Sequence, residues 1–135
     1  MKIYRGIAIN ENETINSNLG VSWSLDIIFA ENHAKSIASV RGKDGYIVLE
    51  AEIEEDVIEM NNTLFAMENR SNEYEVVLNH GTELVTYVEI TTIESIEQYA
   101  KIEGVAVTET NFEDYCNSYE GELTSEDFFN LANEF

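Results

Sequence analysis

Alternation of apolar and polar side chains predicts several β-strands along this chain. Five stretches share a period close to two and are rich in Ile, Val, Tyr or Trp: residues 2–9, 20–24, 46–53, 74–78 and 83–90. Residues 79–82, with the sequence NHGT, are expected to join the last two strands as either a hairpin or a tight connection. Residues 54–60 are expected to form a short strand or a turn. The pattern thus predicts a sheet of about five or six strands.

Apolar residues spaced by three or four predict a helix over residues 25–40, with Ser24 or Asp26 as its N-cap. Asn-rich residues 11–20 are expected to be a loop, and residues 61–72 a loop or a loop that carries one helical turn. These segments intervene between strands, so the expected class is α+β with a mixed β core.

Helical spacing also dominates the last third of the chain. Three helices are expected there, over residues 91–104, 111–121 and 124–135. In the last of them Thr124 is the N-cap, and Asp127, three residues on, completes a near capping box. The fold is therefore expected to be an α+β domain with a helical, acidic C-terminal third.

The length of 135 residues is that of one domain, expected to span residues 1–135. No stretch approaches the ~20 apolar residues that cross a bilayer, and the N-terminus is too quickly polar for a signal peptide. A single cysteine, Cys116, excludes an internal disulfide framework and fits the reducing cytoplasm. His33, His80 and Cys116 are too widely spaced to favour a metal site, and His33 is expected to be a packed helix residue.

The net charge of −20 narrows the classes of partner. There are 27 acidic and 7 basic residues, and the 53 residues from 83 onward carry 13 acids and only one base, Lys101. Direct nucleic-acid binding is disfavoured, because the phosphate backbone is bound by Lys and Arg. A basic protein is a natural partner for such a surface. Simple solubility explains the same charge.

Five polar residues on the predicted strands or directly before one carry the candidate chemistry. Arg5 lies inside an apolar strand and needs a carboxylate or phosphate partner, so it serves either a salt bridge or a phosphorylated ligand. Ser22 and Ser24 share one strand face, and their hydroxyls need hydrogen-bond partners if they are buried. Alternatively, Ser24 is a helix N-cap and Ser22 lies on the surface. Glu73 and Glu75 share another face, where they form either a solubilising edge or a ligand-binding pair.

In this order, these pieces resemble a known family. The chain resembles the R-S-E class of mono-ADP-ribosyltransferases. The resemblance rests on YRG in the first strand, GVSWSLD leading into a helix, GYIVLEAEI and then EYEVV. That family uses an arginine on its first strand, a Ser-Thr-Ser-like strand, and a Glu-x-Glu motif after a mobile loop. The resemblance covers roughly residues 2–90, and the opening is similar to compact bacterial and phage members.

The resemblance implies NAD as substrate and an ADP-ribosyltransferase-like fold. Arg5 would hold the pyrophosphate or the adenosine ribose, and Ser22 would orient Glu75 or the nicotinamide ribose. Ser24 would support the strand geometry. Glu75 would bind a ribose hydroxyl and stabilise the oxocarbenium-like cation that forms when nicotinamide leaves.

The resemblance also implies how the acceptor is bound. Glu73 would position or deprotonate it, and in the family that glutamate accompanies arginine acceptors. The loop before the motif, with Phe65 near its middle, would recognise the acceptor protein. The sequence does not distinguish transfer to arginine from transfer to water.

A second hypothesis keeps the fold without the catalysis. The acidic C-terminal third would then imitate nucleic-acid phosphates and occupy a basic groove, as an inhibitor of a host or phage defence protein does. The two hypotheses separate at Arg5, Ser22 and Glu75, because an enzyme loses its function when Glu75 becomes Gln and a charge mimic does not.

Overall fold

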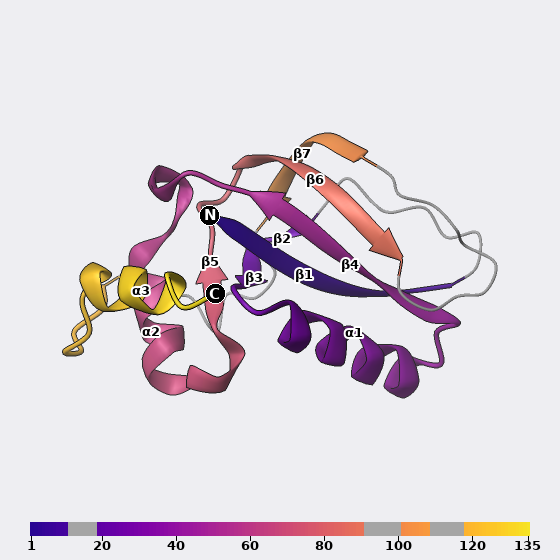
Figure 1. Cartoon of the computed structure of the whole chain (residues 1–135), viewed down its shortest axis with the longest axis horizontal. Coiled ribbons are helices and arrows are strands. Elements are labelled where there is room, and N and C mark those ends of the chain that lie inside the picture. Colours follow the sequence, from indigo (N-terminus) through magenta and orange to yellow (C-terminus); the bar gives the residue numbers. More distant parts are fainter. Residues whose placement is uncertain (11–18, 91–100, 109–117) are drawn as a thin grey trace.

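The computed structural model describes residues 1–10, 19–90, 101–108 and 118–135 of the chain (Figure 1). Seven strands in these residues form one sheet in the order β2-β7-β6-β4-β1-β3-β5. Their bounds are β1 Lys2–Ile9, β2 Leu19–Gly20, β3 Ser22–Ser24, β4 Gly45–Glu52, β5 Glu75–Val77, β6 Glu83–Ile90 and β7 Lys101–Thr108. The helices are α1 Ile27–Arg41, α2 Met60–Asn69 and α3 Ser125–Ala132, with short 3₁₀ turns η1 Glu55–Val57 and η2 Ser71–Glu73. The class is α+β, as expected.

The sheet is mostly antiparallel and strongly curled. β1 pairs along its whole length with β4, and β4 pairs on its other side with β6. β2 and β3 are separated by Val21 alone, yet β2 pairs with β7 while β3 pairs with β1 and β5. Because one residue of chain spans only about 3.5 Å, the two ends of the sheet must approach each other. Figure 1 shows β6 and β7 bending over the rest of the sheet accordingly.

The curled sheet buries different side chains on its two faces. Alternate residues of β4, among them Ile47 and Leu49, enter the main core together with Trp23 of β3 and Phe128 of α3. Tyr46 and Val48 point to the opposite face, where α1 covers them. Both faces of β4 are covered, which explains why its sequence is a continuous apolar stretch and does not alternate with polar residues.

Gly6 determines how closely α1 packs on β1. A Cβ atom at this position would lie 2.0 Å from the carbonyl oxygen of Ala30 and 2.7 Å from the Cβ of Ala34. The helix begins at its N-cap Asp26, whose side chain accepts from the backbone N–H of Ile28, and it ends at Gly42 in the left-handed conformation. Of the two N-caps considered, Asp26 is therefore the one used.

The segment expected to be a loop over residues 61–72 is mostly helical, so that prediction is wrong. α2 has low intrinsic propensity because of its Asn residues, but Leu64 and Ala66 are buried and the side chain of Glu59 caps the helix by accepting from the backbone N–H of Asn62. The connection after β5 is the tight one of the two alternatives: a turn at Gly81 separates β5 from β6, and the two strands do not pair.

The C-terminal third is only partly helical. The helix expected over residues 91–104 is wrong at residues 101–104, which lie in β7 and pair with β6. Residues 91–100 lie outside the described residues, as do 111–117 of the next expected helix; the rest of that helix, residues 118–121, is not helical.

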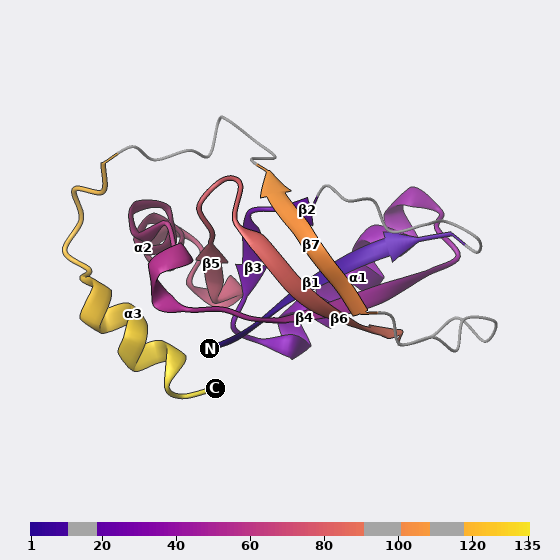
Figure 2. The same ribbon diagram turned by 90° about the horizontal axis from the view of Figure 1, so that it is seen from above.

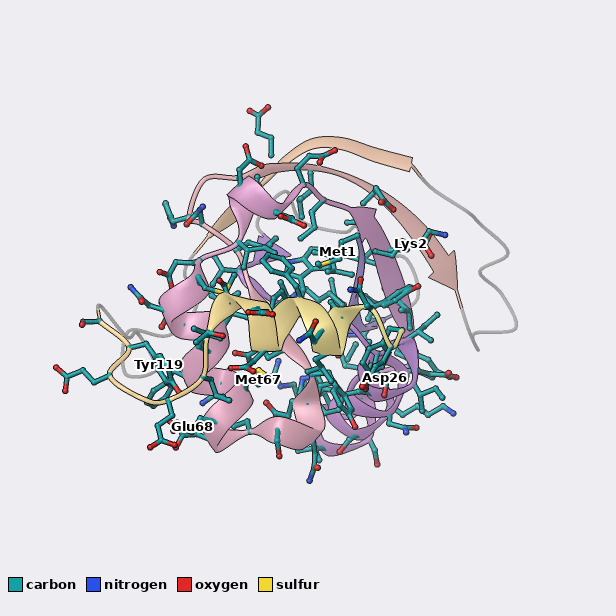
Figure 3. The ribbon with its side chains drawn as sticks, turned by 60° about the vertical axis from the view of Figure 1, so that its left-hand side comes forward. Met1, Lys2, Asp26, Met67, Glu68 and Tyr119 are labelled. Carbon is teal, nitrogen blue, oxygen red and sulfur yellow. The ribbon has the colours of Figure 1, made fainter. Side chains whose placement is uncertain are left out.

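The last expected helix is confirmed as α3. Thr124 is its N-cap, and the complete capping box with Asp127 is present. Figure 3 shows α3 lying across α2, with Tyr119 on the segment that leads into it. The N- and C-termini lie close together (Figure 2), and Met1 and Phe135 line a cavity of about 350 Å³ there.

Candidate functional site

A cavity of about 300 Å³ lies beside β1, where β1 and β3 diverge. The two strands pair only at Tyr4 and Ser24, so β1 continues past its partner and its residues 5–8 line the cavity. The side chains that line it form two sets, one on the strands and the turn before β5 and one on α1. We call the first the strand wall: Arg5, Ser22, Ser24, Glu73 and Glu75. We call the second, on α1, the helix wall: Phe29, His33, Ile37 and Arg41.

Arg5 is the positively charged residue of the strand wall, and its side chain is partly buried. Its Nη1 donates to the carbonyl oxygen of Ser22 at 2.5 Å, while its buried Nε has no hydrogen-bond partner among the described residues. Burial lowers the pKa of Arg5, and the carboxylate of Glu75 opposes that shift. An arginine stays protonated in proteins, so the site holds a buried cation with an unused donor. An anionic ligand in the cavity would offset the positive charge of this guanidinium.

The serine strand links Arg5 to the glutamates. Ser24 Oγ donates to the backbone carbonyl of Glu73 at 2.8 Å and accepts from the backbone N–H of Asp26 at 3.0 Å. Trp23, between the serines, is 2% exposed in the main core, and its indole N–H donates to Gly20. The period of two therefore places both serines at the cavity.

The two glutamates do not share one strand face, contrary to expectation. Glu73 ends the 3₁₀ turn η2, and Glu75 begins β5, because Tyr74 between them is left-handed with φ 50°. This conformation costs a non-glycine residue about 1–3 kcal/mol. Two contacts hold it: the backbone N–H of Leu25 donates to the Tyr74 carbonyl at 2.9 Å, and the Tyr74 ring meets Phe135 edge-on at 5.0 Å. Both glutamates nevertheless line the cavity.

Arg70 joins the two glutamates, and the sequence analysis missed it. Its Nη2 donates to Glu75 Oε2 at 3.1 Å, and its Nε lies 3.4 Å from Glu73 Oε2. Its backbone is also tied on both sides, since its N–H donates to Ala66 and its carbonyl accepts from Glu73. Two features of the sequence could have pointed to Arg70: it lies three residues before Glu73, and the chain has only 7 basic residues.

Phe65 does not line the cavity, and the segment that carries it is helix α2 and not a loop. Its ring lies beneath the guanidinium of Arg70, with 6.0 Å between Arg70 Cζ and the ring centroid. Phe65 therefore supports the arginine that holds the glutamates. The structure gives no contact between Phe65 and the cavity itself.

The helix wall was also missed. Its four residues are spaced by four, so they form one stripe along α1. Phe29 and His33 stack with 5.8 Å between ring centroids and 20° between ring planes. His33 is exposed, contrary to the expectation of a packed histidine.

The comparisons with protein families, curated proteins and solved structures find no match to this chain. Within residues 1–10, 19–90, 101–108 and 118–135, no group of three His, Cys, Asp or Glu side chains is arranged to hold a metal ion. No helix in this part of the chain is long and apolar enough to cross a membrane. Any functional conclusion therefore depends on the residues of the cavity.

Proposed function

We propose that this protein is a mono-ADP-ribosyltransferase of the R-S-E type, which transfers ADP-ribose from NAD to a protein acceptor. The main support for this activity is that Arg5, the Ser22–Ser24 strand and the Glu73–Glu75 segment all line one cavity. These pieces are up to 70 positions apart in the chain, and the resemblance rests on the same residues. Chance alone would not be expected to gather them around one opening.

The chemistry of the strand wall suits the departure of nicotinamide from NAD. The bond between the ribose C1′ and the nicotinamide nitrogen breaks, the bond electrons leave with nicotinamide, and the ribose becomes oxocarbenium-like. Glu75, whose side chain is 13% exposed, would stabilise that positive charge and bind a ribose hydroxyl. Arg5, which lines the cavity, would bind the pyrophosphate as a charge-assisted donor.

Transfer is completed by an acceptor nucleophile, whose atom bonds to C1′ while its proton passes to a base. Glu73 is suited to that role because it is the more exposed of the two glutamates, at 39% of its side chain. Arginine is the acceptor that a Glu-x-Glu arrangement implies. Arg70, by holding both carboxylates, would keep them in place between the two steps.

The test is the release of nicotinamide from NAD, followed together with the incorporation of ADP-ribose into a basic protein or a soluble arginine analogue. Glu75→Gln should lower nicotinamide release about 10³-fold with the fold retained. Glu68→Gln is the matched control, since Glu68 is an exposed glutamate on α2 that does not line the cavity, and it should leave the rate unchanged. Equal rates in wild type and Glu75→Gln would refute the proposal.

A second candidate function, binding of a basic protein without catalysis, is favoured by the exposed acids. Glu54, Glu55 and Asp56 are consecutive and exposed, as are Glu122, just before α3, and Glu126, in its first turn. For this function, affinity for the partner should fall steeply with salt and should not depend on Glu75. Such a protein would act as an inhibitor or nucleic-acid mimic.

A further inference from the structure

The helix wall is longer than the reacting end of the proposed substrate requires. Phe29 and Arg41 are twelve residues apart, which corresponds to about 18 Å along the axis of α1. Arg5, Ser22 and Glu75 belong to the strand wall, where they offer a guanidinium, a hydroxyl and a carboxylate to a ribose and a phosphate. A ligand that contacts the whole length of the helix wall and also reaches the strand wall is therefore longer than a mononucleotide.

The composition of the helix wall indicates what that ligand carries. Phe29 and His33 present stacked, nearly parallel rings, and His33 is exposed, so a face of this pair is accessible from the cavity. Two helical turns after His33, Arg41 lines the same cavity and makes no ion pair with another described residue. Aromatic rings bind the flat face of a nucleic-acid base, and a guanidinium binds phosphate oxygens.

Charge is distributed unevenly across the cavity, in a protein of net charge −20. The glutamates that line it are Glu73 and Glu75, and Arg70 pairs with both of them. The helix wall carries no acid, so an anion beside Arg41 meets no unpaired carboxylate on that wall. The cavity therefore favours an anionic ligand despite the overall charge of the chain.

From these observations we infer that the helix wall is a binding site for a purine nucleoside monophosphate. The base stacks on Phe29 and His33, and the phosphate oxygens accept hydrogen bonds from Arg41. This inference rests on the proposed function, since it assigns the adenosine monophosphate half of NAD to α1 and leaves the nicotinamide half to the strand wall. It makes the helix wall the part of the site that selects a dinucleotide over nicotinamide mononucleotide.

Binding of the two halves can be measured separately by titration calorimetry with AMP and with nicotinamide mononucleotide. The variants are Arg41→Gln and His33→Ala, and Lys35→Gln is the matched control. Lys35 is on the same helix, but it pairs with Glu31 and does not line the cavity. We expect AMP to bind, Arg41→Gln and His33→Ala each to raise its Kd about tenfold, and Lys35→Gln to leave it unchanged.

The outcomes separate the inference from the function on which it rests. No binding of AMP, or AMP binding that is equal in wild type and Arg41→Gln, overturns the inference. If nicotinamide mononucleotide binds and Arg5→Lys weakens it, the proposed function survives that failure. AMP binding that depends on Arg41, without any binding of nicotinamide mononucleotide, supports the inference and counts against the transferase. Adenosine and inorganic phosphate, titrated alone, show whether the base and the phosphate both contribute.

Discussion

The two walls of the cavity differ in how their side chains are held. In the strand wall, Arg5 donates to Ser22, Ser24 donates to Glu73, and Arg70 fixes the carboxylate of Glu75. In the helix wall, the contact between members is the stacking of Phe29 on His33. A wall fixed by hydrogen bonds is suited to chemistry, where small displacements are costly, whereas open side chains on a helix are suited to binding.

Gly6 lies where α1 packs against β1, and its substitution should lower the free energy of unfolding more than the other changes proposed here. Gly6→Ala places a Cβ 2.0 Å from the Ala30 carbonyl oxygen, so α1 must move away from β1. We expect the free energy of unfolding to fall by about 3 kcal/mol in urea titrations.

Gly42→Ala is the control for this substitution. Gly42 has φ +63° and open space around it, so its loss should cost only about 1 kcal/mol of backbone strain. If Gly6→Ala were no more destabilising than Gly42→Ala, the close approach of α1 to β1 would be wrong.

Arg70→Gln should weaken the strand wall without unfolding it. The two carboxylates lose their shared donor and repel each other, so we expect kcat for nicotinamide release to fall about 100-fold. The free energy of unfolding should change by no more than about 1 kcal/mol, because the pairs are partly exposed.

The measurements are steady-state kinetics and urea unfolding on the same samples, with Arg70→Lys alongside. Lysine restores the charge but not the two-pronged geometry, so it should recover only part of the rate. Unchanged kcat in Arg70→Gln would show that the glutamates need no such support.

Substitution of Tyr4 should have the smallest effect on the free energy of unfolding, and this effect should depend on pH. Burial and the neighbouring Glu50 and Glu52 raise the pKa of Tyr4 above its ordinary value. A raised pKa stabilises the folded protein fully below the pKa of the unfolded chain, about 10, and this contribution is lost as the pH rises through the folded value.

Tyr4→Phe removes this contribution. The unfolding free energy of the variant should therefore decline less steeply above about pH 10 than that of wild type, with the two curves parallel at lower pH. Chemical unfolding at a series of pH values tests this, and parallel curves throughout would contradict it.

The sequence predicted β1, β4 and α1 well, because strong periodic patterns and a capped helix start determine them locally. It failed where tertiary contacts decide the outcome. α2 is held by the burial of Leu64 and Ala66 in spite of its asparagines, and residues 101–104 form a strand because β6 offers a partner. Periodicity alone cannot separate a short apolar strand from a helix.

The residues of the strand wall were named from the sequence, but their arrangement was not. The left-handed Tyr74 and the 3₁₀ turn before it move Glu73 off the strand, and this brings Arg70 against both glutamates. No local sequence pattern predicts a tyrosine in the left-handed conformation. The helix wall was missed because a stripe of Phe, His, Ile and Arg does not stand out as either apolar or charged.

The central claim is that Arg5 binds the anionic part of NAD, and thermal unfolding with and without NAD tests it most directly. NAD at about 100 times its Kd should stabilise wild type by about 2.7 kcal/mol, which raises Tm by several degrees. Arg5→Ala should abolish the shift, and Arg5→Lys, which keeps the charge, should retain part of it. A shift of equal size in all three proteins, or no shift in wild type at any NAD concentration, would contradict the account.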